Sequence, residues 1–158
     1  MLLPFLLQAI TIGIDEVWFH WKRSLPKWER IGHPIDTMTV ILCIGYVLLV
    51  PFSKQAILPY CLLAVLSCLI VTKDEFVHKT HCCAAENWFH AVLFLLHPIV
   101  LVAAGLIWPV IWGAEPLPWL LFCQDSQLFF ASFMKCQLSA LALFMGYQVI
   151  FWNFVWKS

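Results

Sequence analysis

The stretch AVLFLLHPIVLVAAGLIWPVIWG, residues 91–113, decides the fold, because it contains no Asp, Glu, Lys or Arg. A helix needs about 20 mostly apolar residues to cross the roughly 30 Å hydrocarbon core of a bilayer. This stretch is long enough, so it predicts a membrane-spanning helix. The whole chain has the same character: of its 158 residues, 63% are hydrophobic and 11% are charged. Such a composition excludes a disordered chain and argues against a soluble domain.

Three further apolar stretches predict membrane spans. They cover about residues 35–52, 56–72 and 128–156, and the last is long enough to tilt. The first fourteen residues are apolar but too short, so they form a fifth span only if their helix continues through Asp15 to about Trp21. We therefore predict an all-α integral membrane protein, a single domain over residues 1–158. Its five helices form a bundle in which four or five cross the membrane.

Basic residues are distributed unequally between the two sides of this bundle. The side formed by residues 15–34, 73–90 and 157–158 holds Lys22, Arg23, Lys27, Arg30, Lys73, Lys79 and Lys157, and the other side holds Lys54. Cytoplasmic loops of membrane proteins carry the excess of Lys and Arg. The first side is therefore predicted to be cytoplasmic, with the C-terminus, in what we expect to be a bacterial inner membrane. Lys and Arg together equal Asp and Glu in number, so no nucleic-acid partner is expected.

Acidic and histidine side chains concentrate in the two cytoplasmic segments. Three Glu-x-x-x-His pairs and one Glu-x-x-His-x-x-His run occur there. Residues three or four apart share a helix face, so each pair can present a carboxylate and an imidazole to one metal ion. Di-iron and di-manganese bundles use a closely related set of Glu and Glu-x-x-His ligands from four helices. The predicted metal ligands are Glu16, His20, Glu29, His33, Asp36, Glu75, His78, His81, Glu86 and His90.

The surroundings of these ligands leave two points open. Pro34 is typical of the first turn of a helix, which would place Glu29 and His33 on different segments. His97 lies further inside its span, where it either supports the ligands or bonds a neighbouring helix. Metal-bound imidazoles usually donate their other N–H to a carboxylate or carbonyl, a role predicted for the neighbouring aspartates. These are Asp15, Asp36 and Asp74.

The chain also contains an internal repeat. Residues 2–20, LLPFLLQAITIGIDEVWFH, resemble residues 57–78, ILPYCLLAVLSCLIVTKDEFVH, since both begin with Leu-Pro-aromatic and end in Asp-Glu and His. We therefore predict two parallel helix pairs, at about residues 2–52 and 56–113, followed by a final helix at about 128–156. Parallel repeats are related by an axis along the membrane normal, which would bring both cytoplasmic segments around one metal site.

The ligand pattern resembles two classes of iron protein. Membrane desaturases and hydroxylases carry His boxes at the cytoplasmic face of four spans, and His78-x-x-His81 is similar to part of such a box. Ferritin-like di-iron proteins combine Glu and His ligands. The likeness covers residues 15–36 and 74–97 and concerns ligand type and position only, so it indicates no particular family.

These observations favour a membrane-embedded oxidoreductase with two metal ions. Iron is the expected metal, with manganese or zinc as alternatives. Its substrate would be membrane lipid or a lipid-soluble molecule, such as an acyl chain or a quinone-like compound, and it would need an electron donor. One alternative is a zinc-dependent membrane hydrolase, which needs only three protein ligands and a water. The other alternative is a metal transporter or carrier, which would need polar ligands along the spans, and these are mostly apolar here.

Overall fold

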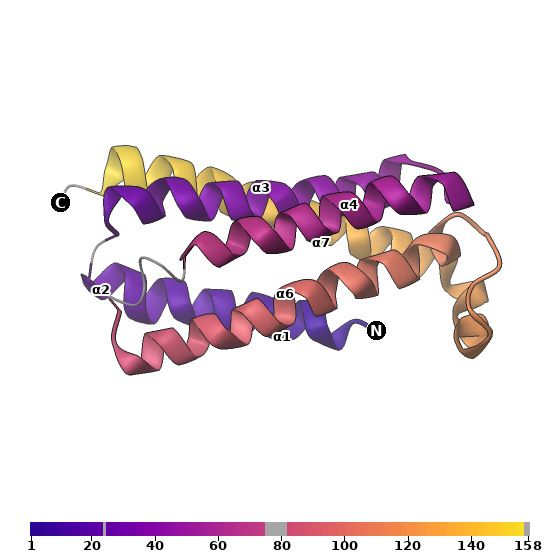
Figure 1. The fold of residues 1–158 in the computed structure, drawn as a ribbon, viewed down its shortest axis with the longest axis horizontal. Helices are drawn as coiled ribbons and strands as arrows, with labels where there is room; N and C mark the ends of the chain where they lie inside the picture. The colour runs from indigo at the N-terminus through magenta and orange to yellow at the C-terminus, as the bar shows by residue number, and fades with distance from the viewer. Residues whose placement is uncertain (24, 75–81, 157–158) are drawn as a thin grey trace.

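In the computed structural model, which describes residues 1–23, 25–74 and 82–156, every regular element of these residues is a helix (Figure 1). Four helical runs are long and apolar enough to cross a membrane, as the composition predicted. They are α3 (Lys27–Leu49), α4 (Lys54–Val71), α6 (Ala84–Ile111), and the run of η3 (Pro118–Ser126), α7 (Gln127–Ile150) and η4 (Phe151–Val155). The all-helical fold class is confirmed.

The N-terminal helical segment continues past Asp15. It consists of α1 (Leu3–Ile14), the π-helical η1 (Asp15–His20) and α2 (Trp21–Arg23), with no break between them. At about 1.5 Å per residue the segment is roughly 30 Å long, comparable with the hydrocarbon core of a bilayer. The continuation on which a fifth span depends is therefore present. π-Helical turns are rare and frequently lie at functional sites.

The helices run alternately up and down the bundle (Figure 1). α3 packs against α4, α6 and α7, and α1 packs against α6. One end of the bundle collects η1 and α2, the first turns of α3 and α6, and the last turns of α4 and α7. We call this end, formed by residues 15–23, 25–33, 71–74, 82–93 and 148–156, the polar end. The basic residues predict that it faces the cytoplasm.

Two helices begin before the apolar stretches that predicted them. α3 begins at Lys27 instead of about residue 35, and α6 begins at Ala84 instead of about residue 91. α3 also continues through Pro34, so the helix does not start at this proline, which settles one of the two points left open. A proline inside a helix removes one backbone hydrogen bond, and the packing of α3 against three other helices offsets that loss. As a result, Glu29 and His33 lie on one continuous helix.

The end opposite the polar end is closed by aromatic packing. The Trp108 side chain is 1% exposed, and its ring lies 5.2–5.6 Å from the rings of Tyr46, Phe52 and Tyr60. Its indole N–H donates to the carbonyl of Val50 at 2.8 Å. This hydrogen bond satisfies the one polar group of the buried ring.

The outer faces of α4 and α7 are mostly apolar and exposed. Along their spans only 17% and 11% of the residues are buried within the bundle. Side chains of this kind are normally buried in a soluble protein, whereas a bilayer accepts them. Exposed examples include Leu58, Leu62, Val65, Leu66, Leu69, Leu128, Phe129, Leu143 and Ile150. These faces are suited to contact lipid.

Candidate metal centre

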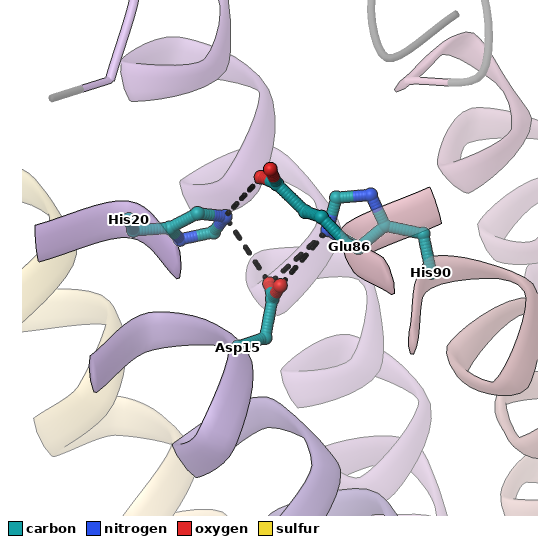
Figure 2. Close-up of side chains that lie close together, drawn as sticks. All are labelled: Asp15, His20, Glu86 and His90. Carbon is teal, nitrogen blue, oxygen red and sulfur yellow. Dashed lines mark hydrogen bonds and ion pairs between the residues drawn. The ribbon is translucent and has the colours of Figure 1, made fainter. Parts of the chain in front are cut away.

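Four buried polar side chains meet at the polar end of the bundle. Asp15 and His20 come from η1, and Glu86 and His90 come from α6 (Figure 2). Each residue is 4% exposed or less, and each offers one ligand atom within 4.8 Å of the others. Asp15 lies between the two imidazoles: its Oδ2 is 3.2 Å from His20 Nε2 and its Oδ1 is 3.1 Å from His90 Nε2. Glu86 Oε1 completes the group, 4.0 Å from His20 Nε2.

The π-helical turn explains why Asp15 reaches His20. In a regular α-helix, residues three or four apart share a face, and residues five apart point in different directions. The π-helix has i→i+5 hydrogen bonds, and here the backbone N–H of Trp21 bonds the carbonyl of Glu16. This wider turn brings residues 15 and 20 together. The α-helical period predicted that Asp15 would support a metal-bound imidazole instead of contacting the metal. No signal in the sequence indicated the π-helical turn that changes its position.

Glu16 contacts the Nδ1 side of the His20 ring, and so takes the supporting role that the spacing predicted for Asp15. Its Oε2 is 3.0 Å from His20 Nδ1. Its Oε1 accepts hydrogen bonds from the Tyr147 hydroxyl and the Trp152 indole N–H, both at 2.7 Å. A carboxylate that accepts from one imidazole nitrogen fixes the ring and directs its other nitrogen toward a metal. Here that other nitrogen, Nε2, faces Asp15.

A second group of ligand atoms adjoins the first. It consists of His20, Glu29 and His33, whose ligand atoms also lie within 4.8 Å of one another. Glu29 is 0% exposed, and the ring of His33 stacks on that of His20 with the centroids 5.0 Å apart. The continuity of α3 through Pro34 is what allows Glu29 and His33 to face His20 together. Because His20 belongs to both groups, the two form one cluster.

Asp36 and His97 have other principal contacts. Asp36 pairs with Lys73 and belongs to neither group of ligand atoms. His97 Nε2 is 2.9 Å from the hydroxyl of Ser67, which is 2.7 Å from that of Thr39. His97 therefore bonds a neighbouring helix, one of the two roles left open. The predicted ligands Glu75, His78 and His81, and the side chain of Asp74, lie outside what the structure describes.

A cavity of about 120 Å³ adjoins the cluster inside the bundle. Side chains from α1, η1, α3, α4, α6 and α7 line it. The cluster contributes Asp15, His20, His33 and His90 to one end of its wall, and Glu16 lies beside them. A small molecule in this cavity would contact the same side chains that offer metal ligands.

The cluster can bind either protons or metal ions. An imidazole between carboxylates can carry a proton, and a protonated His20 would form ion pairs with Asp15 and Glu16. A metal ion would replace that proton and neutralise the carboxylates together. Burying a carboxylate without compensation costs several kcal/mol, so a buried group rich in carboxylates needs one or the other. Carboxylate and imidazole donors suit iron, manganese and zinc.

Comparisons of the chain with protein-family models, with curated proteins and with solved structures gave no match. Function is therefore inferred from the chemistry of the cluster and its cavity.

Proposed function

We propose that the chain is a membrane-embedded oxidoreductase with a two-metal centre, most simply di-iron, which acts on a lipid-soluble substrate. One observation carries this proposal: four buried carboxylate and imidazole side chains from two helical segments converge within 4.8 Å, beside a second group of three. Ionisable groups buried within membrane bundles are costly and commonly mark functional sites.

Each group would hold one ion. Asp15, His20, Glu86 and His90 supply two carboxylates and two imidazoles for the first. Glu29 and His33 lie beside them for the second. Because Glu16 occupies Nδ1 of His20, this imidazole would serve one ion through Nε2. Iron, when bound by such donors, supplies one-electron chemistry with oxygen.

The second ion needs more protein ligands than the described residues supply. The predicted ligands Glu75, His78 and His81 remain the candidates for this role. They follow η2 (Thr72–Asp74) and precede α6 in the chain, so the segment that contains them joins elements of the polar end. In this proposal Asp36 pairs with Lys73 instead of binding an ion.

The proposal includes the orientation and the repeat inferred from the sequence. The polar end would face the cytoplasm, following the excess of Lys and Arg. α1 to α3 would form one repeat and α4 to α6 the other, each contributing ligands to a shared centre. His20 and Glu29 come from the first half and Glu86 and His90 from the second.

A zinc-dependent membrane hydrolase is the second candidate. A catalytic zinc requires three protein ligands, and the group of Asp15, His20, Glu86 and His90 alone contains four. This excess of ligands favours two metal ions over a single zinc. Metal transport is less favoured, because a transported ion needs ligands along its path. Toward the opposite end of the bundle, the interior is packed with apolar residues such as Val47, Ile107 and Trp108.

Oxygen reactivity separates the two candidates. Full-length protein is purified in detergent, reduced under anaerobic conditions and then exposed to oxygen, while near-ultraviolet absorption is recorded. An iron centre changes oxidation state and its spectrum changes, whereas zinc has no such change available. We expect an oxygen-dependent change that Glu86→Ala abolishes. Protein that takes up only zinc when offered both metals, with no spectral response, would instead support the hydrolase.

A further inference from the structure

The cavity beside the metal centre extends from the cluster toward the middle of the bundle. On α1 and η1 its wall runs from Asp15 to Gln8, and on α6 it runs from His90 to His97. Each pair is seven residues apart, which corresponds to about 10 Å of helix rise. The cavity therefore has the cluster at one end and a second polar region about two helical turns deeper.

The deeper region offers hydrogen-bonding groups to a ligand. Among the described residues, the side chain of Gln8 forms no hydrogen bond, although it lines the cavity. The ring of His97 lines the same region. Between the two ends, Gln148 Oε1 accepts from the Thr37 hydroxyl at 2.8 Å, so its amide N–H groups remain as donors. Polar groups inside a protein normally have hydrogen-bond partners. A ligand with acceptor atoms would supply partners for these amide donors.

The middle of the cavity is apolar. Its walls there include Ile12, Val40, Phe94, Leu141 and Phe144, contributed by four different helices. A flat apolar ring fits such walls, and aromatic side chains favour stacked or edge contacts with it. The cavity volume, about 120 Å³, is comparable with the roughly 150 Å³ of an apolar cavity that holds one benzene molecule.

We propose that this cavity binds the ring of a quinone or quinol, with one ring oxygen toward the metal centre and the other toward Gln8 and His97. The inference rests on the proposed function, because the bound quinone or quinol would be the substrate of the redox centre. An acyl chain is a poorer complement, since its hydrocarbon would leave the deep polar groups without partners. Water alone, about four molecules at roughly 30 Å³ each, is the other occupant that the test must distinguish.

Binding is measured with 2-methyl-1,4-benzoquinone, a quinone ring without a lipid tail whose size is close to that of benzene, added to full-length protein in detergent and followed by calorimetry. We expect saturable binding of one ring per chain. Leu141→Trp fills the cavity and should weaken binding at least tenfold. Leu143→Trp is the matched control, because Leu143 lies on the same helix but is 77% exposed. This control should bind the quinone like the unmodified protein.

A milder pair of variants tests the deep polar region without changing the volume much. Gln8→Leu removes the amide and should weaken quinone binding about tenfold, the effect of losing one good hydrogen bond. Gln137→Leu makes the same change on α7 outside the cavity and should have no effect. Thermal unfolding of each variant shows that it is folded, and if Leu141→Trp does not fold, the Gln8 pair decides.

Metal content is measured on the same samples, so that failure of the quinone site can be distinguished from failure of the proposed metal centre. Iron in the protein together with quinone binding that neither Leu141→Trp nor Gln8→Leu weakens would overturn the inference alone. Binding of palmitate that Leu141→Trp abolishes, with no binding of the quinone, would also overturn it and indicate an acyl chain. Absence of both ligands would indicate a water-filled cavity and overturn it as well. Protein without metal that still binds the quinone in this cavity would contradict the proposed function and support the ring site.

Discussion

Asp15 and His90 lie 75 positions apart in the chain, yet Oδ1 of Asp15 is 3.1 Å from Nε2 of His90. This contact joins the N-terminal helical segment to α6 inside the bundle, where the two side chains are only 5% and 6% exposed. Asp15 also contacts His20, so one carboxylate lies between two imidazoles.

Asp15 should be as important for metal binding as His90. Asp15→Ala removes the carboxylate between the two imidazoles, and we expect the bound metal to fall to less than half of that in the unmodified protein. Asp36→Ala is the matched control, because Asp36 is paired with Lys73 and belongs to neither ligand group. Metal analysis of the purified variants checks this. Loss of metal in Asp36→Ala with retention in Asp15→Ala would contradict this expectation and support the assignment made from spacing, with Asp36 as a ligand.

Glu16 should act through His20. Glu16→Gln weakens the acceptor that orients the imidazole, and such changes typically reduce metal affinity about 10–100-fold. Tyr147→Phe removes one of the hydrogen bonds to Glu16 and should have a smaller effect in the same direction. Tyr46→Phe is the control, since that hydroxyl bonds the Ala56 carbonyl at the far end of the bundle. Titration with a metal-sensitive dye measures the affinities, and equal affinities in all three variants would contradict this role.

The orientation in the membrane is tested with reporters. A reporter fused after Ser158 should read cytoplasmic, and reporters inserted near Gln55 or Pro116 should read external, because the basic residues predict this arrangement. The insertion sites lie in or beside the connections at the end opposite the polar end. The opposite pattern would place the metal centre on the outer side of the membrane.

Stability should depend on Trp108 independently of the metal. Trp108→Ala removes a buried ring that contacts three other aromatic side chains, and the free energy of unfolding should fall by about 3–5 kcal/mol. Trp119→Ala, at a ring that is 59% exposed, should change it little. Denaturant titration in detergent measures both. A stabilising effect of Trp108→Ala, or loss of metal from variant protein that is still folded, would contradict this separation of core and site.

Much of the fold follows from apolar content, because a span is recognised by length and hydrophobicity. The starts of α3 and α6 were missed since their first turns carry polar residues such as Glu29 and Glu86, which a hydropathy argument assigns to loops. The same residues were predicted as candidate ligands, and the structure places both in the cluster. Asp15 was placed behind the ligands because its contact with His20 depends on a π-turn, which the α-helical period does not anticipate.

Metal analysis of paired histidine variants tests the central claim most directly. The unmodified full-length protein, purified without added metal, should contain two iron ions per chain. His90→Ala should lose most of this iron, whereas His97→Ala, a buried histidine on the same helix that bonds Ser67, should retain it. Protein that contains no metal, or variants that lose metal equally, would contradict a metal centre built on Asp15, His20, Glu86 and His90.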